Sequence, residues 1–132
     1  MSKQIVHVGP VGMGSRMKLV NNLCMAGAME ALFEGLTLGR KGSLRRSDDE
    51  GPDGGALSSP LLKMKGEAVL EQNFEPLFSV KHTAKDVHLA LEEAKGGGAS
   101  LPLASLLDQI FPEAGSRGLS EEDYASIVKL LD

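Results

Sequence analysis

The longest regular pattern of apolar residues lies between Ser15 and about Arg40, a stretch that contains no proline. Its apolar side chains recur every three or four residues, as on one face of a helix: Met17, Val20, Leu23, Cys24, Ala28, Leu32 and Leu36. A second set makes another side apolar: Met25, Ala26, Met29 and Phe33. Ser15 is suited to cap the start of this helix, and Gly39 or Gly42 to end it. A helix that is apolar on two sides is predicted to be central and buried.

Two further helices are predicted in the middle of the chain. Ser58-Ser59-Pro60 has the serine and the first-turn proline of a helix start, and Leu61, Leu62 and Met64 give a short apolar face. Helical spacing then returns and ends at the glycines 96–98, after a basic Lys95. The apolar residues of this later helix are Val80, Ala84, Val87, Leu91 and Ala94.

The last part of the sequence predicts two more helices. One runs from about Pro102 to Phe111 and stops at Pro112, because proline lacks the N–H that continues a helix. The other begins at the capping-box pattern from Ser120 to Asp123, before Tyr124, Ile127, Val128 and Leu131. Together these patterns predict a mainly α protein, a single helical domain built on one long central helix.

Two segments do not fit this helical plan. Gln4 to Val8 is short and β-branched and ends at Gly9-Pro10, which predicts one strand and a turn. A lone strand cannot satisfy its own backbone groups, so residues 1–12 are interpreted as an orphan remnant strand and interdomain turn, and 13–132 as the helical domain. Residues 42–55, GSLRRSDDEGPDGG, have almost no apolar side chain and are predicted to be a disordered loop.

Composition excludes several classes of function. The chain has 132 residues, a net charge of -4 and a pI near 5.4, with scattered lysines and arginines, so no nucleic-acid partner is expected. No apolar stretch reaches the roughly 18 residues of a membrane span and no signal-peptide pattern is present, which predicts a cytoplasmic or organelle-matrix location. The single Cys24 is expected to be a buried thiol. His82 and His88 are six residues apart on a helix and face different ways, so no metal site is expected.

Gly9, Gly12 and Gly14 lie between the predicted strand and the long helix, which is also the order of a dinucleotide-binding turn. The dinucleotide fingerprint spaces its glycines by two and then three residues, whereas these are spaced by three and then two. The acidic residue expected at the end of a second strand, about 20 positions later, falls inside the long helix instead. A simple strand-to-helix turn is therefore the favoured interpretation.

Lys18 and Asn22 are four residues apart, so their side chains share a face near the start of the long helix. The positive end of the helix dipole and the neighbouring Arg16 make the ammonium charge of Lys18 less favourable there, which favours release of its proton. The alternative is a solvated lysine, with Asn21 and Asn22 merely tolerated in a helix. The residues alone leave both interpretations open, with the second favoured.

The segment VGPVGMGSRMKLVNN resembles the start of the second domain of the β-hydroxyacid dehydrogenases, a family that includes 3-hydroxyisobutyrate dehydrogenases and glyoxylate or succinic semialdehyde reductases. The family pattern places glycines before a lysine, with an asparagine four positions later, and these fall on Gly12, Gly14, Lys18 and Asn22. Three other segments agree: GALSSPLLKMKG, FEPLFSVKHTAKDVHLALEEA and GLSEEDYASIVKLL.

The resemblance implies hydride transfer between NAD or NADP and a small β-hydroxyacid or semialdehyde. Lys18 would protonate the forming alkoxide, while Gly12, Gly14, Asn21 and Asn22 would bind the substrate. The family's lysine-aspartate pair falls on Lys85 and Asp86, and the resemblance places Lys85 near the cofactor. It also places Phe78 on the nicotinamide side, although the residues alone indicate a surface charge at Lys85 and a core aromatic at Phe78.

The family's first domain, a Rossmann-type sheet that holds the dinucleotide, has no counterpart in these residues. The chain is therefore expected to be inactive alone and to need a separate Rossmann domain. Family members also carry a helix where this sequence has the charges and glycines of 45–54, so uncovered apolar surface and a homo-oligomer are expected. The alternative function is a non-catalytic dimerisation or binding module derived from the same domain.

Overall fold

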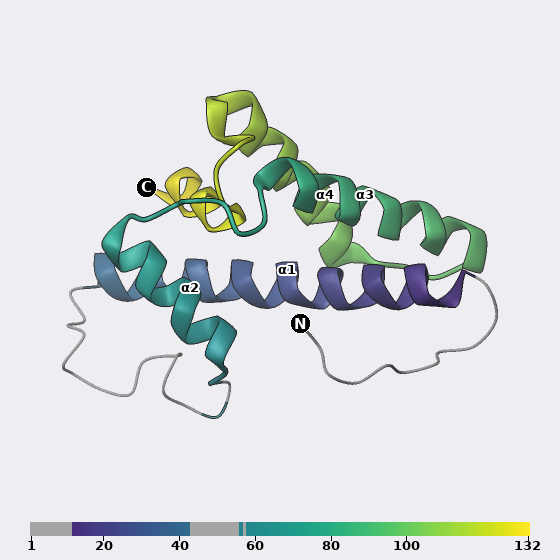
Figure 1. Cartoon of the computed structure of the whole chain (residues 1–132), viewed down its shortest axis with the longest axis horizontal. Coiled ribbons are helices and arrows are strands. Elements are labelled where there is room, and N and C mark those ends of the chain that lie inside the picture. Colours follow the sequence, from purple (N-terminus) through teal and green to yellow (C-terminus); the bar gives the residue numbers. More distant parts are fainter. Residues whose placement is uncertain (1–11, 43–55, 57) are drawn as a thin grey trace.

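The computed structural model describes residues 12–42, 56 and 58–132, all of them helical or in turns and connections. The long helix α1 (Met13–Lys41, 29 residues) runs along the longest axis of the molecule (Figure 1). This confirms the mainly α fold with one long central helix. The predicted strand from Gln4 to Val8 and the predicted loop, apart from Gly42, lie outside the described residues.

The start of α1 differs from the prediction. The helix begins two residues before Ser15, and the residue that precedes it is Gly12, whose φ of 94° lies in the left-handed region that favours glycine. No side chain caps this end, so the expected serine cap was wrong. At the other end, Gly42 terminates the helix, and its N–H donates to the carbonyl oxygen of Leu38 at 2.8 Å.

The buried side of α1 is the second apolar set, because the other helices pack there. Ala26, Met29 and Phe33 are at most 2% exposed, and Leu32 joins them. The predicted first face is largely exposed: Met17 and Val20 are 45% and 54% exposed, and Cys24 and Ala28 are also exposed. The expectation of a buried Cys24 was therefore wrong, since no described element covers that side of the helix.

Two helices follow the prediction closely. Helix α2 (Pro60–Glu71) has proline in its first turn, and the Ser59 hydroxyl accepts a hydrogen bond from the Leu62 N–H at 3.1 Å. Helix α3 (Val80–Gly97) is capped by Ser79 and ends at Gly98, which has a left-handed φ of 72°. In Figure 1, α2 crosses one end of α1, and α3 lies along the other part.

Helix α4 (Pro102–Ala114) packs against α3 and continues through Pro112, so the predicted stop at Phe111 was wrong. Phe111 and Ala114, on either side of the proline, are both fully buried. Burial of this apolar surface offsets the hydrogen bond that proline cannot make. The helix runs on into a π-helical turn, η1 (Gly115–Leu119), where Gly118 has a φ of 85°.

The final helix, η2 (Tyr124–Leu131), is a 3-10 helix that begins later than the predicted capping box. Its cap is Asp123, whose carboxylate accepts from the Ala125 N–H at 3.0 Å, so Ser120 is not the capping residue. The ring of Tyr124 lies 6.5 Å from that of Phe33, which joins η2 to α1. No helix in the described ranges is long and apolar enough to cross a membrane.

Candidate functional site

The first half of α1 runs antiparallel to α3, and polar contacts join the two helices. Asn22 Nδ2 donates to Asp86 Oδ2 at 2.5 Å. Nearer the start of α1, Arg16 Nε lies 3.1 Å from Glu93 Oε2, and both side chains are more than half exposed. An exposed ion pair of this kind stabilises a fold by at most about 1 kcal/mol. The half-buried Asn22–Asp86 contact is therefore the one that fixes the geometry here.

Lys18 lies one turn before Asn22 on the same face of α1 and is exposed. Within the described residues no carboxylate comes within ion-pair distance of its ammonium. Gly12 and Gly14, at the helix start, and Asn21 are also exposed. An amine with this exposure is accessible to a ligand that approaches the start of α1.

Asp86 is a site residue to which the sequence assigned no role. Its neighbour Lys85 is exposed, whereas Asp86 is half-buried and turned toward α1. The only sequence signal was its place in the lysine-aspartate pair, next to the buried Val87. The structure thus joins Asn22 to Asp86 across the α1–α3 interface, with Lys18 one turn before Asn22 on α1 and Lys85 next to Asp86 on α3.

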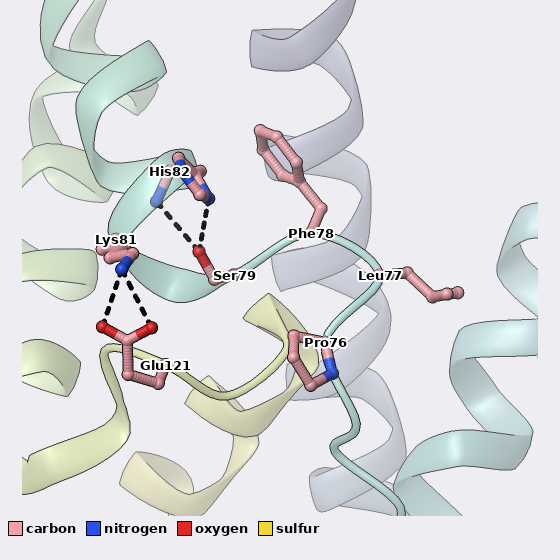
Figure 2. Close-up of a pocket in the computed structure, with 7 residues that line it drawn as sticks. All are labelled: Pro76, Leu77, Phe78, Ser79, Lys81, His82 and Glu121. Atoms are coloured by element: carbon pink, nitrogen blue, oxygen red, sulfur yellow. Dashed lines mark hydrogen bonds and ion pairs between the residues drawn. The ribbon is translucent and has the colours of Figure 1, made fainter.

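Phe78 lies elsewhere, just before the first turn of α3. Val80, where α3 starts, precedes Asp86 by six residues, which is about 9 Å of helix. Phe78 borders an open cavity of about 430 Å³. Figure 2 shows the residues that line it: Pro76, Leu77, Phe78, Ser79, Lys81, His82 and Glu121. Phe78 therefore lies about two helical turns before the Asn22–Asp86 contact, counted along the chain.

The polar groups of this cavity are paired with one another. Lys81 Nζ donates to both oxygens of Glu121, at 2.7 and 2.9 Å, and Ser79 Oγ lies 2.7 Å from His82 Nδ1 (Figure 2). The ring of Phe78 stacks on that of His82, with centroids 5.9 Å apart. The charges of Glu121 and Lys81 balance each other, so the cavity presents the aromatic ring of Phe78 bordered by paired polar side chains.

A buried ion pair underlies the segment that carries Phe78, and sequence reasoning missed it. Lys65 Nζ lies 2.7 Å from Asp123 Oδ1, with both side chains at most 4% exposed. The sequence indicates only a capping box at Asp123 and no role for Lys65. No local pattern reveals the pair, because its members are 58 residues apart.

One buried acid lies on the central helix, away from these contacts. Glu30 is 5% exposed, and burial, with the charge of Glu34 as a second cause, raises its pKa to about 7. Burial also raises the pKa of Tyr124, and the charge of Asp123 adds to this. No group of three or more histidine, cysteine or acidic side chains in the described ranges is placed to hold a metal ion.

Residues 12–131 match a family model described as the NAD-binding domain of NADP-dependent 3-hydroxyisobutyrate dehydrogenase. Glyoxylate/succinic semialdehyde reductase 1 of Arabidopsis thaliana is 34% identical over 131 residues, covering 98% of this chain and 45% of the reductase. The 2-(hydroxymethyl)glutarate dehydrogenase of Eubacterium barkeri is 33% identical, covering 98% of this chain and 44% of the dehydrogenase. The chain thus spans about half the length of these relatives.

The fold is also that of solved dehydrogenase structures. The Mycobacterium tuberculosis 3-hydroxyisobutyrate dehydrogenase, determined with L-serine, has a TM-score of 0.84 at 22% identity, over 99% of this chain and 47% of that one. The Salmonella typhimurium 3-hydroxyisobutyrate dehydrogenase has a TM-score of 0.78 at 24% identity, over 90% of this chain and 42% of that one.

Proposed function

Because the chain belongs to the 3-hydroxyisobutyrate dehydrogenase family, whose cofactor is NAD or NADP, we propose that it is the helical part of an oxidoreductase for a small β-hydroxyacid or semialdehyde. The observation that carries this proposal is the exposed Lys18 beside the Asn22–Asp86 contact. The names of the relatives support the substrate class, since they are reductases of glyoxylate and succinic semialdehyde and a dehydrogenase of a hydroxyacid.

The described residues fit part of a nicotinamide dinucleotide. Phe78 offers an aromatic face beside a cavity of about 430 Å³, which suits one ring-bearing fragment and not a whole dinucleotide. Lys85 is an exposed cation on α3, the helix that begins two residues after Phe78, and it is suited to a phosphate or carboxamide oxygen. We propose that Phe78 and Lys85 contact the cofactor, and that a separate Rossmann domain, in the same or another polypeptide, holds the rest.

In this proposal Lys18 is the proton donor. A reduced nicotinamide, when bound, would supply the hydride for the carbonyl carbon of the semialdehyde. Negative charge then grows on the carbonyl oxygen, and the Lys18 ammonium stabilises that charge and transfers a proton to the oxygen. The products would be the hydroxyacid, the oxidised nicotinamide and a neutral Lys18 amine, which regains its proton from water. The exposure of Lys18 supports this role, because a substrate oxygen can reach its Nζ.

In the same proposal, Asn22 orients the substrate at the start of α1. Its Nδ2 is held by Asp86, so its carbonyl oxygen is the atom left to accept a hydrogen bond from the substrate or from Lys18. The exposed N–H groups and backbone of Gly12 and Gly14 lie at the positive end of α1, which suits the carboxylate of a β-hydroxyacid. Asn21, also exposed, adds an amide donor on the neighbouring face. The substrate would thus bind across the start of α1.

The proposal is tested by reconstitution. The chain is combined with the nucleotide domain of a relative and with NADH or NADPH, and short semialdehydes are added while nicotinamide absorbance is followed. Turnover is expected only in the mixture, and Lys18→Ala should remove most of it. Lys18→Arg should remove it too, because arginine keeps the charge but does not release a proton. Lys63→Ala, which alters an exposed lysine of α2, is the matched control. No turnover with any semialdehyde or cofactor would reject the enzymatic proposal.

A second candidate is a non-catalytic module that joins two copies of this chain. The uncovered side of α1 favours it, since Val20 is 54% and Leu38 75% exposed. Along this side of α1, the spacing of one set of residues is the reverse of the spacing of another: Met17, Val20 and Cys24 against Ala31, Gly35 and Leu38. Two antiparallel copies of α1 would therefore bring large side chains of one copy against small ones of the other. Glu34 of one copy would then lie within a turn of Lys18 of the other, an attraction between opposite charges.

Sedimentation velocity over a range of protein concentrations tests this second candidate. We expect a dimer that Val20→Lys and Leu38→Lys dissociate, while Leu70→Lys, at an exposed leucine of α2, does not. A monomer at every concentration would reject self-association. We further propose a cytoplasmic or organelle-matrix location, because the exposed thiol of Cys24 stays reduced there.

A further inference from the structure

The segment that carries Phe78 has no helix of its own and is held by one buried carboxylate. Asp123 is 2% exposed. Its Oδ2 accepts hydrogen bonds from two consecutive backbone groups, the N–H of Leu77 at 3.1 Å and that of Phe78 at 3.2 Å. Its Oδ1 accepts from Lys65 Nζ at 2.7 Å and from the Ala125 N–H at 3.0 Å. A single side chain thereby joins α2, the segment before α3 and the start of η2.

Backbone hydrogen bonds hold the same segment from its other side. The Tyr124 N–H donates to the carbonyl oxygen of Phe78 at 2.9 Å, and the Asp123 N–H donates to that of Phe74, also at 2.9 Å. The N–H and the carbonyl of Phe78 are therefore both tied to the pair 123–124. With its backbone fixed, the Phe78 ring lies edge-on to Tyr124, with centroids 6.5 Å apart, and stacks on His82.

The hydrogen bonds of Asp123 indicate that its carboxylate serves to orient the 77–78 backbone. A buried ion pair often stabilises a fold no more than well-packed apolar side chains of the same volume would. An apolar residue at position 123, however, would leave the N–H groups of Leu77 and Phe78 without an acceptor. A carboxylate has two oxygens, so it can serve these amides with one and Lys65 with the other. Lys65 balances the buried charge, while Asp123 sets the direction of the Phe78 backbone.

We propose that Asp123 is a positioning residue for the cofactor: it fixes the 77–78 backbone so that the Phe78 ring is presented to the nicotinamide. This inference rests on the proposed function in taking Phe78 as the side chain that meets that ring. Lys65 supports the charge of Asp123 but contributes no hydrogen bond to the 77–78 backbone. Loss of Lys65 and loss of the Asp123 charge should therefore have different consequences for cofactor binding.

Amide NMR spectroscopy on the full chain supplies two measurements. Hydrogen exchange at the Leu77 and Phe78 amides reports their hydrogen bonds to Asp123, and titration with NADH or NADPH reports affinity. Asp123→Asn leaves a single acceptor oxygen, for which the 77–78 amides compete with Lys65 and the Ala125 N–H. Exchange at the Leu77 and Phe78 amides, corrected for global unfolding, should therefore rise about tenfold or more. Cofactor affinity should fall, and Phe78→Ala should lower it too. In the double variant the Asp123 substitution should add nothing, because its effect acts through Phe78.

Lys65→Met is the matched variant, since it breaks the same buried pair but leaves Oδ2 facing the 77–78 amides. It should lower the unfolding temperature as Asp123→Asn does, yet leave the corrected exchange and the cofactor affinity unchanged. Glu113→Gln, at an exposed carboxylate of α4 outside the cavity, controls for a change of charge and should leave cofactor affinity unchanged. Should Asp123→Asn fail to fold, Asp123→Glu keeps both oxygens but displaces them, and the same non-additivity with Phe78→Ala is expected.

The opposite results have distinct meanings. Equal losses of affinity in Lys65→Met and Asp123→Asn, or additive losses with Phe78→Ala, would overturn the positioning role and leave the proposed function standing. If the wild-type chain shows no shift changes with either cofactor at millimolar concentration, both alone and mixed with the nucleotide domain, the contact of Phe78 with the nicotinamide is rejected in both proposals. The exchange comparison then still decides whether Asp123 fixes the Phe78 backbone.

Discussion

Asn22 on α1 and Asp86 on α3, 64 residues apart in sequence, are joined by a 2.5 Å hydrogen bond one helical turn from Lys18. Asp86 occupies one N–H of the Asn22 amide and fixes the orientation of its plane, so the carbonyl oxygen and the second N–H meet a ligand in a set direction. The contact therefore links the packing of the two helices to the orientation of the candidate site. It also fixes how far along the α1 axis Lys85 lies from the start of that helix.

Asp86→Asn should lower catalysis more than stability. The substitution keeps the shape of the side chain but exchanges a charge-assisted hydrogen bond for a neutral one, which is weaker and permits Asn22 to rotate. In the reconstituted mixture we expect kcat/KM to fall about 10- to 100-fold, and the free energy of unfolding to fall by about 1 kcal/mol. Steady-state kinetics and urea unfolding measure the two effects.

Glu93→Gln is the control for that variant, because it breaks the exposed Arg16–Glu93 pair on the same two helices. Its free energy of unfolding should stay within about 0.5 kcal/mol of the wild type, and its kinetics should not change. Equal kinetic losses in the two variants would show that Asp86 merely holds the helices together.

The helices were predictable from sequence because their signals are local. Proline at the start of α2, the glycines after α3 and the three- to four-residue spacing of α1 each act within a few residues. The buried side of α1 was not predictable in the same way, since both sides are apolar and the choice depends on where α3 and η2 pack. The Lys65–Asp123 pair was missed for the same reason: it joins elements that are distant in sequence.

The candidate site was predictable only in part. The spacing of Lys18 and Asn22 placed them on one face of a helix, and the structure keeps them there. The partner of Asn22, however, comes from another helix, so spacing within α1 carries no information about Asp86. The distance of Phe78 from that contact likewise depends on the connection between α2 and α3.

Cys24 should react rapidly with a thiol reagent in the folded chain. Its side chain is exposed on the uncovered side of α1, so dithionitrobenzoate should modify one thiol per chain without denaturant, at a rate near that of the unfolded chain. Absorbance of the released thiolate gives the rate and the stoichiometry. A rate that rises more than about tenfold on unfolding would contradict the exposure, or would reveal that a second copy covers this side of α1. Repeating the reaction with Val20→Lys distinguishes these two explanations.

Glu30 should make the chain less stable as the pH rises from about 4.5 to 7. Its pKa is about 7 in the folded chain, against 4.5 as the ordinary value, so the folded state binds more protons than the unfolded state in this range. Stability from this group is complete below pH 4.5 and is lost as the pH rises through 7. The shift corresponds to a loss on the order of 3 kcal/mol.

Glu30→Gln, which resembles the protonated acid, isolates this contribution. Urea unfolding of both proteins at pH 5 and pH 8 should give a smaller stability difference between the two pH values for the variant, with the variant more stable than the wild type at pH 8. Glu34→Gln should produce part of the same change, since the charge of Glu34 is the second cause of the raised pKa. Identical pH dependence in wild type and Glu30→Gln would show that other groups cause it.

Gly118→Ala should destabilise the turn between α4 and η2. Gly118 has a φ of 85°, a left-handed backbone conformation that costs a residue with a Cβ about 1 kcal/mol or more. No neighbouring atom lies within 4 Å of the added methyl group, so backbone strain alone sets the effect. Gly97→Ala is the matched control, because Gly97 lies within α3, lacks a positive φ and is equally open around its Cα. Alanine there should raise stability by up to about 1 kcal/mol, and thermal unfolding of the two variants should shift in opposite directions.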